Sequence, residues 1–326
     1  MRSIQTKVRF PLSSVKPLEH LAGYRRYCLT ETARAFQGGI HRRLRSPLSG
    51  EPLQKAGEVE GFLYLRCPTS GSLFLAEFPD PEAWADLLSS VNRYRHSPDT
   101  FHLGLAQSRT DHVYFPKVEW IEETLALQGM RRPRILEAVV PPSDLSVLLR
   151  RSGAFSAIEP VDEMRLTHGG RMGEGPSLRE GFQVALLLES LDRSDDPVAL
   201  IERVGQLLES GGLLFVTALV CSGFDMEVLG LNNQYLYPPD RANCFSLNGL
   251  KQLLEGSGFS LLEVSTPGVL DVEIVQAHFQ ADPSLPLPGF LRQILGSSEE
   301  TRMAFQAFLQ QQGFSSFARI VARRKG

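Results

Sequence analysis

Three glutamates stand in or directly after apolar runs of the kind that form buried strands, and they are the best candidates for ligand chemistry. Glu137 lies in RILEAVV, Glu159 ends FSAIE, and Glu189 directly follows FQVALLL. Ligands of open α/β sheets bind beyond the carboxyl ends of the strands, so we expect all three carboxylates to face one crevice. An acidic side chain at the end of a second strand can accept hydrogen bonds from ribose hydroxyls, which makes Glu159 the candidate for that role. Glu137 could accept a hydrogen bond from the amino group of a ligand.

A second set of residues has the spacing of a zinc site but lacks three of the four cysteine ligands. The pairs Ser46/Ser49 and Cys67/Ser70 have the CxxC spacing of a zinc ribbon, with one thiol remaining. A structural zinc is closed by four ligands such as thiolates, and a serine hydroxyl is not ionised at neutral pH. We therefore expect no zinc here. The hairpin should be held instead by apolar side chains that alternate along its strands: Phe62, Tyr64, Leu73 and Leu75.

The remaining polar candidates have no recognisable ligand spacing. His96, His102 and His112 precede the apolar runs, and His168 lies in the polar, Gly-rich residues 165–180, which predict a loop. The sequence has no P-loop, no GxSxG elbow and no HExxH pattern. It offers no ready nucleophile and no catalytic metal site.

Alternating apolar runs and amphipathic stretches from Pro133 onward predict an α/β fold with a doubly wound, mainly parallel sheet. Continuous apolar runs indicate strands buried on both faces. Pro197 at its start and Gly211-Gly212 at its end delimit one helix. The expected strands are 134–140, 155–159, 182–188, 213–219, 259–264 and 318–322, and the expected helices are 144–151, 196–210, 247–256 and 298–311.

The chain before Pro133 is less regular. It predicts a short helix at residues 31–36, small strands with turns over 46–75, a helix from Pro81 and a helical segment over 116–129. The basic cluster Arg42, Arg43 and Arg45 is expected to be a solvated loop.

Composition limits the classes of partner and the compartment. The net charge is −3, with 42% hydrophobic and 22% charged residues among 326, as in an ordinary soluble domain. This balance gives no case for nucleic acid or for a membrane surface as partner. Four scattered cysteines and the absence of a long apolar run make a cytoplasmic protein the expectation.

Several segments resemble a bacterial family of class I S-adenosylmethionine (AdoMet) methyltransferases that often carry an N-terminal zinc ribbon and modify small molecules or sugars. The similarity covers about residues 44–326 and is best in FQVALLLESLDRSDDPVALIERVGQLLESGGLLFVTALVCSGFD, in YPPDRANCFSLNGLKQLLEGSGFSLLEVSTPGVLDVEIV and in the terminal FSSFARIVARRKG. The resemblance implies a Rossmann-like, seven-stranded sheet. It also implies three parts: residues 1–80 as an N-terminal extension with a metal-less, zinc-ribbon-like module, 81–132 as a helical lid or linker, and 133–326 as the methyltransferase-like domain.

The resemblance assigns roles to particular residues. Cofactor-binding positions would be Glu137, Val139, Glu159 and Glu189, and substrate-binding positions would be Ser222, Asp225, Tyr237 and Arg241. Three histidines usual in the family are replaced, by Ser190, Arg241 and Phe317.

The cofactor loop departs from the family pattern. The family's strand ends in a glycine-rich turn, whereas residues 137–143 read EAVVPPS and contain no glycine. A β-branched residue resists positive φ, and proline fixes φ and removes a donor. A pocket lined by backbone can hardly survive unchanged.

Two functions from different classes follow. One is an AdoMet-dependent methyltransferase that acts on a small molecule or sugar, with an altered cofactor pocket. The other is a catalytically inactive relative that binds or scaffolds a protein partner, such as an active paralogue. An NAD-dependent oxidoreductase is disfavoured because GxGxxG is missing.

Overall fold

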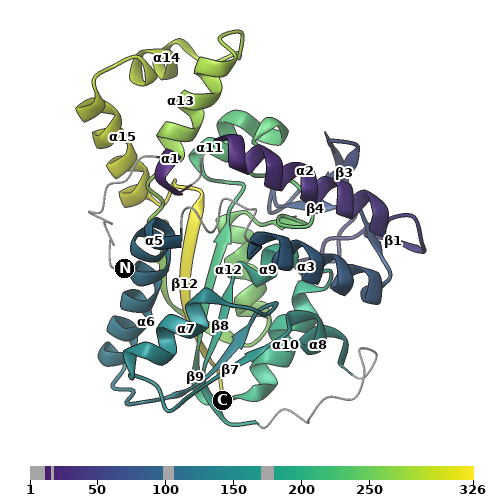
Figure 1. Ribbon diagram of the computed structural model, residues 1–326, viewed down its shortest axis with the longest axis vertical. Coiled ribbons are helices and arrows are strands. Elements are labelled where there is room, and N and C mark those ends of the chain that lie inside the picture. The colour runs from purple at the N-terminus through teal and green to yellow at the C-terminus, as the bar shows by residue number, and fades with distance from the viewer. Residues whose placement is uncertain (1–11, 16–17, 98–105, 170–179) are drawn as a thin grey trace.

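A computed structural model describes residues 12–15, 18–97, 106–169 and 180–326 of the chain (Figure 1). Its centre is a six-stranded sheet of order β11-β12-β9-β8-β6-β7. These strands are β6 (Arg134–Ala138), β7 (Ala157–Val161), β8 (Phe182–Leu188), β9 (Leu208–Leu219), β11 (Phe259–Ser265) and β12 (Phe317–Arg324). The α/β class and the mainly parallel sheet are thus confirmed.

The register of the sheet separates four parallel strands from an antiparallel edge. Strands β7, β6, β8 and β9 run parallel, and β12 pairs antiparallel with both β9 and β11. The described residues supply six strands to this sheet, so the seventh strand that the family resemblance implies is not among them.

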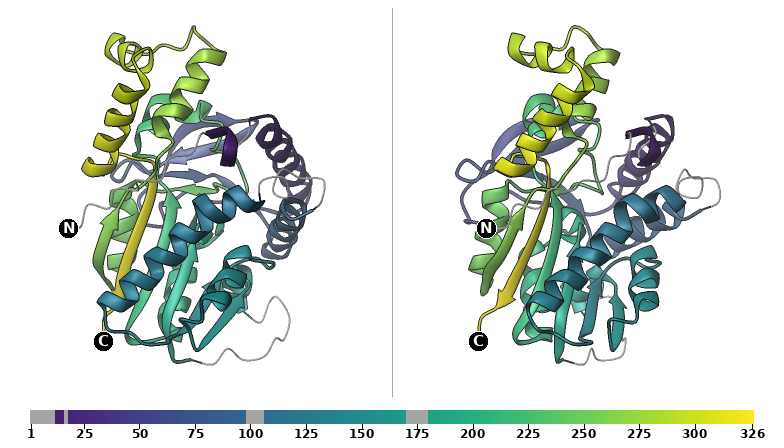
Figure 2. Two further views of the ribbon diagram at one scale, coloured as in Figure 1. Left: turned by 60° about the vertical axis from the view of Figure 1, so that its left-hand side comes forward. Right: turned by 90° about the vertical axis from the view of Figure 1, so that its left-hand side faces the viewer.

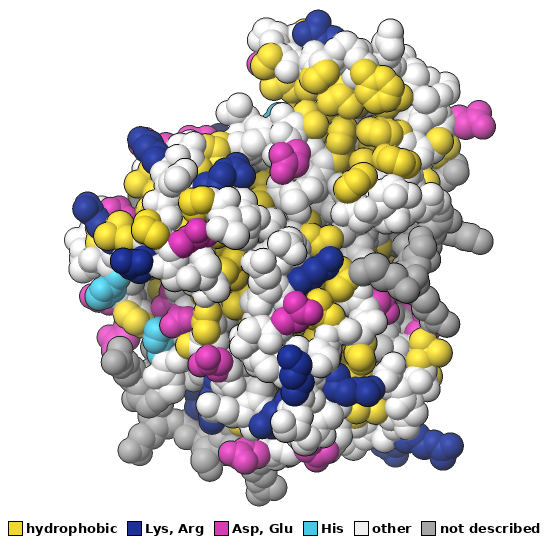
Figure 3. Space-filling model, turned by 180° about the vertical axis from the view of Figure 1, so that it is seen from behind, with side chains coloured by type: hydrophobic (Ala, Val, Ile, Leu, Met, Phe, Trp, Pro, Cys, Tyr) yellow, Lys and Arg dark blue, Asp and Glu magenta, His cyan; other side chains and the backbone are white. Residues whose placement is uncertain are grey.

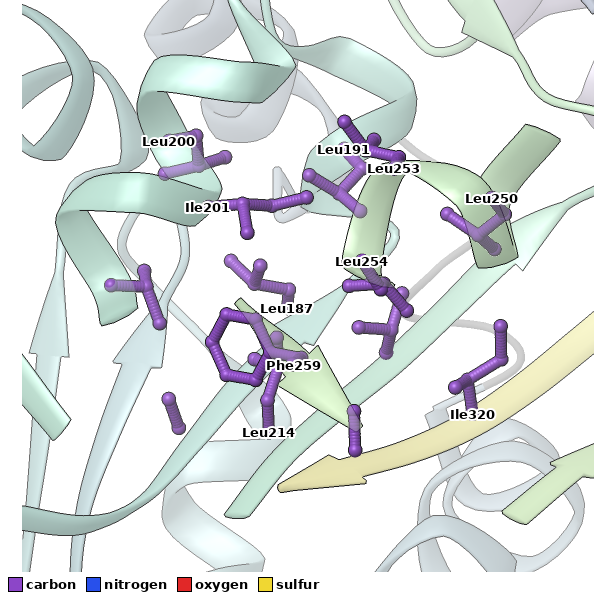
Figure 4. Packing of buried hydrophobic residues seen from close by; sticks show 14 of the residues in the cluster. Leu187, Leu191, Leu200, Ile201, Leu214, Leu250, Leu253, Leu254, Phe259 and Ile320 are labelled. Atoms are coloured by element: carbon purple, nitrogen blue, oxygen red, sulfur yellow. The ribbon is translucent and has the colours of Figure 1, made fainter. Parts of the chain in front are cut away.

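Helices cover both faces of the sheet, as the continuous apolar runs require. On one face, α10 (Pro197–Leu207) and α12 (Leu247–Gly256) pack on alternate residues of the strands, such as Leu187, Leu214 and Ile320 (Figure 4). On the other face lie α6 (Phe115–Leu127) and α7 (Asp144–Ser152), which cover the residues of opposite parity. Figure 2 shows α6 lying diagonally across the strands.

The N-terminal part forms a second, smaller layer of structure. Helix α2 (Leu18–Ala35) and helix α3 (Pro81–Arg95) pack together beside a four-stranded sheet of order β10-β4-β3-β2. Its strands are β2 (Gln54–Val59), β3 (Phe62–Arg66), β4 (Leu73–Leu75) and β10 (Asn243–Cys244), and β1 (Ile40–Arg42) pairs with β5 (Glu77–Pro79). Strand β10 comes from the C-terminal half of the chain. The hairpin core contains Tyr64, Leu73 and Leu75, as expected, with Phe62 half-buried at its margin.

Four expectations about local structure are wrong. The short helix at 31–36 is the end of α2, which extends back to Leu18 because Leu21, Tyr24 and Cys28 share a buried face. The helix expected at 196–210 ends at Leu207, and Gly211 bends the following strand instead of ending the helix.

The predicted loop over 165–180 begins as a helix, α8 (Glu163–His168), because the Asp162 carboxylate accepts a hydrogen bond from Met164 N at 2.9 Å and caps it. Residues 170–179 lie outside the described part.

The basic cluster of Arg42, Arg43 and Arg45 is not a solvated loop either. Arg43 is half-buried between the rings of Phe74 and Phe78 and donates to Asn243 Oδ1, while its exposed neighbours are tied to Glu77 and Gly50.

Three further helices extend beyond the sheet: α13 (Asp271–Ala281), α14 (Gly289–Leu295) and α15 (Glu299–Gln312). Hydrophobic side chains gather on their outer surface (Figure 3), where Phe290, Phe308 and Phe314 are exposed. Among the described helices, none is long and apolar enough to cross a membrane.

Candidate functional site

The crevice at the carboxyl ends of β6 and β8 is partly filled by the elements around it. Helix α3 and the start of α6 lie over it, and the space left is a cavity of about 130 Å³. Its lining includes Asn92, Lys117, Glu137, Val139 and Glu189. Two of the three predicted glutamates are therefore brought together, together with Val139.

The loop after β6 is tied from both sides. Val139 N donates to Val161 O at 2.9 Å, and Asn92 of α3 donates to Val140 O at 2.8 Å and to Pro142 O at 3.2 Å. The peptide bond between Pro141 and Pro142 is cis. The backbone that a glycine-rich loop would offer to a ligand is here covered by α3.

Glu137 is hydrogen-bonded by two serines at the start of the following helix, α7. Its side chain is buried and accepts hydrogen bonds from Ser143 Oγ, at 2.8 Å, and from Ser146 Oγ. Burial raises the pKa of Glu137, and the two serine hydroxyls partly oppose this. Neither carboxylate oxygen is left without a partner for a ligand's amino group.

Glu189 binds two cations at once. Lys117 Nζ lies 3.2 Å from Oε1, and an Arg241 nitrogen lies 3.0 Å from Oε2. Burial alone would raise the pKa of Glu189, but Lys117 and Arg241 outweigh it and hold that pKa well below its usual range. The Lys117 side chain is 8% exposed and that of Glu189 is 28% exposed, so the pair is only partly shielded from solvent.

Arg241 also reaches a second carboxylate, Asp192, at 3.3 Å. Asp192 is fully buried, and its Oδ2 accepts a hydrogen bond from Leu219 N at 3.0 Å. Burial raises the pKa of Asp192 to about 7, and Arg241 opposes this. We name the residues Lys117, Glu189, Arg241 and Asp192 the cleft network.

All three residues that replace expected histidines lie around this network. Arg241 belongs to it, the ring of Phe317 lies 5.7 Å from Lys117 Nζ, and Ser190 Oγ donates to Ala138 O at 2.7 Å. The structure thus places substitutions that are far apart in the sequence at one site. The contribution of Lys117 and Asp192 was missed by sequence reasoning. The one available signal for Lys117 was a charged residue in an apolar helical stretch.

The position inferred for Glu159 is wrong. Strand β7 continues to Val161, so Glu159 is its third residue and pairs with Arg134 at 2.7 Å. Arg134 begins β6, at the opposite end from the crevice. The acidic residue that ends this strand is Asp162, whose Oδ1 is engaged in capping α8.

The predicted substrate residues divide into two groups. Tyr237 and Arg241 lie near the crevice, and the Tyr237 hydroxyl is 3.4 Å from Asp240. Ser222 Oγ accepts from Leu247 N at 2.9 Å, and Asp225 is buried against Asn233 and Ser316. Ser222 and Asp225 thus anchor the chain and do not line the cavity.

Of the four histidines named above, three lie in the described part of the chain and none of these three lies in the cleft network. His96 is 3.6 Å from Asp144 and His168 is 2.7 Å from Asp195. His112 lies in the π-helical turn η1 (Thr110–Tyr114), and His102 falls outside the described residues.

The zinc-ribbon-like turns keep their shape around a carboxylate. Ser46 Oγ lies 3.5 Å from Cys67 Sγ, and Cys67 donates to Glu51 Oε1 at 2.9 Å. Thr69 also donates to Glu51, and these bonds lower the pKa of Glu51, the Cys67 thiol contributing most. Glu51 thus ties the turn after Ser46 to the turn after Cys67 through hydrogen bonds. The described residues contain no group of three or more His, Cys, Asp or Glu that could hold a metal ion.

Comparison with known families identifies the central part of the chain. Residues 106–264, just under half of the sequence, match a family model described as a methyltransferase domain. This stretch is therefore similar to methyltransferase domains. The match includes the crevice, the loop after β6 and the whole cleft network.

Solved structures similar to the methyltransferase domain include enzymes of diverse chemistry. Magnesium protoporphyrin IX methyltransferase from Synechocystis PCC 6803, with bound S-adenosylhomocysteine, has 14% identity and a TM-score of 0.43 over 76% of this chain and 100% of that chain. A 1,6-didemethyltoxoflavin-N1-methyltransferase from Burkholderia thailandensis has 13% identity and a TM-score of 0.41 over 84% of this chain and 100% of that chain. Similarities this low carry no argument about the chemistry of this chain. No curated protein matches the sequence.

The residues of this methyltransferase domain do not fit AdoMet as they stand. Pockets for ligands of this size usually have about 300–1,000 Å³, well above the cavity of about 130 Å³ at the crevice. The carboxylates of Glu137 and Glu189 are already bound by serine hydroxyls and by cations.

Proposed function

We propose that this chain is a pseudo-methyltransferase: it keeps the methyltransferase domain as a scaffold and serves as the binding partner of another protein, such as an active paralogue. The observation that carries the proposal is the pairing of Glu189 with Lys117 and Arg241. A half-buried carboxylate held by two cations loses interaction free energy if one of them leaves. A ligand would have to supply that free energy before it could enter.

The missing glycines support the same proposal independently. A ligand that approached the loop would also have to displace Asn92 from Val140 O and Pro142 O. The loss would leave the part-buried Val140 carbonyl without its donor, which costs about 1–3 kcal/mol for a buried group, whereas the exposed Pro142 carbonyl can bind water.

A direct test is calorimetric titration of the purified chain with AdoMet and with S-adenosylhomocysteine. The proposal predicts no heat of binding up to millimolar ligand. Micromolar binding that is lost in Glu189→Gln would overturn it. The claim that the chain binds another protein is tested separately. A paralogue that keeps the glycine-rich cofactor loop should co-elute with this chain in size-exclusion chromatography with light scattering.

The second candidate is methyl transfer from AdoMet to a small molecule or sugar. It is favoured by the family match over residues 106–264 and by the retention of Glu137 and Glu189 at the crevice. It requires α3 and the start of α6 to move, because Lys117 must leave Glu189 before the crevice can open. A substrate search would be justified by AdoMet binding in the titration above.

A further inference from the structure

A second cavity lies away from the methyltransferase crevice. It is a groove of about 950 Å³ between helix α2 and the β2–β3 hairpin. Figure 1 shows α2 crossing beside β3 and β4 at this place. The volume falls within the range of pockets that bind organic ligands, about 300–1,000 Å³.

The groove is separated from the crevice by a buried wall. Tyr64 is fully buried and donates to Arg241 O at 2.9 Å, and Arg25 lies over the ring of Tyr237, 5.7 Å from its centre. A ligand of the groove would therefore touch neither Glu137 nor Glu189. Its binding is independent of whether the crevice accepts AdoMet.

The groove is elongated, and polar and apolar side chains line it in about equal measure. One stripe of α2, from Leu21 to Ala33, forms one wall, and Phe62 and Leu63 of the hairpin lie across from it. Residues four apart on a helix lie one above the other. At a rise of about 1.5 Å per residue, the stripe is about 18 Å long. Such a shape suits an extended apolar chain better than a compact ring.

All three carboxylates that line the groove are paired with cations of the protein. Glu58, Glu60 and Glu77 line it, but Lys55, Arg25 and Arg42 pair with them at 3.1, 2.9 and 3.0 Å respectively.

Two donors of α2 remain unused beside these pairs. The guanidinium of Arg26 has no ion-pair partner among the described residues, and the buried Nε of Arg25 has no acceptor there. The unused polar capacity of the groove is therefore cationic and donating.

We propose that this groove binds an amphipathic anion: a molecule with an extended apolar body, which lies along α2, and a carboxylate or similar acceptor group, which pairs with Arg26. The apolar body contributes by leaving water, at about 0.8 kcal/mol for each buried CH₂ group. The anionic head sets the direction in which the molecule lies.

The experiment is calorimetric titration of the full chain with dodecanoate, and with dodecyltrimethylammonium as a probe with the same chain and opposite charge, both below their micelle concentrations. Dodecanoate is expected to bind and the cation to bind at least tenfold more weakly. Arg26→Glu should weaken dodecanoate at least tenfold. Arg131→Glu, an equal charge change at another exposed site, should leave it unchanged.

A second variant tests the location without changing charge. Ala33 is exposed and lines the groove, so Ala33→Trp should fill the groove while the thermal transition stays in place. Equal binding of both surfactants, or dodecanoate binding that Ala33→Trp leaves intact, would overturn the proposal. Sedimentation with phosphatidylglycerol vesicles, abolished by Ala33→Trp, would identify a membrane lipid as the source of the anion; dodecanoate binding alone identifies a free molecule.

Discussion

Each carboxylate oxygen of Glu189 accepts a hydrogen bond from a different cation. These two bonds hold the elements on either side of the crevice together. Lys117 comes from α6 and Arg241 from the loop before β10, so the carboxylate joins two elements across the cavity. Arg241 is shared with Asp192. Groups that share partners in this way do not contribute additively to stability.

Replacing Lys117 by methionine should destabilise the protein. The variant keeps the bulk of the side chain but leaves Glu189 with Arg241 alone, and we expect the free energy of unfolding to fall by about 1–3 kcal/mol. Urea denaturation followed by circular dichroism measures it. Glu119→Gln, on an exposed position of the same helix, is the control and should change little. A Lys117→Met variant as stable as the control would mean that the pair contributes nothing.

Asp192 should make stability depend on pH. Its pKa is about 7 in the folded protein against an ordinary value of 3.8, so between these values the folded state binds more protons than the unfolded state. Stability contributed by the protonated carboxyl is therefore complete below about pH 4 and is lost as the pH rises towards 7.

The matched variant is Asp192→Asn. Relative to wild type, it should become more stable by at least about 1 kcal/mol as the pH rises from 4 to 7, since one pKa unit corresponds to about 1.4 kcal/mol. Urea midpoints across this range provide the measurement. Parallel pH profiles of the two proteins would contradict the raised pKa.

At the scale of elements, α3 replaces the glycine-rich loop as the structure that fixes the turn after β6. Asn92 is the contact between them, through the carbonyls of Val140 and Pro142. A similar close contact joins the end of β9 to the start of β12. Gly223 lies so close there that a Cβ would be 2.2 Å from Ser316 Cα.

Asn92→Ala should lower the free energy of unfolding by about 1–3 kcal/mol, because it removes the donor from two carbonyls. The neighbouring Arg93 is exposed, so Arg93→Ala is the control. Thermal denaturation compares the two. Equal midpoints would show that α3 does not hold the loop.

Gly223→Ala should destabilise by about 1–3 kcal/mol or more, because a new methyl group would meet backbone atoms that cannot easily move. Gly256→Ala is the matched control: nothing lies within 4 Å of a Cβ at the end of α12, so the change should be neutral or stabilising by up to about 1 kcal/mol. Chemical denaturation of both variants gives the difference. A Gly223→Ala protein no less stable than Gly256→Ala would contradict the close contact.

At the scale of the whole molecule, the N-terminal hairpin module (β2, β3 and β4) contacts the central sheet domain through residues far apart in the sequence. Strand β10, from the C-terminal half, pairs with β4 of the module. Arg43 bridges the same boundary, since it donates to Asn243 and to the Asp195 carbonyl and lies over two phenylalanine rings. Burial lowers the pKa of Arg43 to about 10, with Asp195 opposing.

The module and the sheet domain should therefore unfold in one transition. The two tryptophans report on the two parts, since Trp84 packs in the core of the module and Trp120 packs on the sheet. Single-tryptophan proteins made by Trp84→Phe and Trp120→Phe should give coincident fluorescence transitions in urea. Two separated midpoints would instead show that the core around Trp84 and the core around Trp120 unfold independently.

The sequence by itself determined most of the strands and helices, and it showed which glycines and cysteines of the family pattern are missing. Apolar runs read correctly as strands buried on both faces, since burial on both sides leaves no polar alternation. The absence of glycine from residues 137–143 and of three thiols from the zinc-ribbon-like pairs was visible without coordinates.

Only the tertiary structure decided where the charges go. Lys117, Glu189 and Arg241 are far apart in the chain, and no local pattern relates them. Strand ends were uncertain by two residues, enough to move Glu159 from the crevice into the body of β7 and to leave Asp162 at its end. Local sequence sets the periodicity of an element, but the partner of a buried charge depends on which elements the fold brings together, because an unpaired buried charge is too costly to remain.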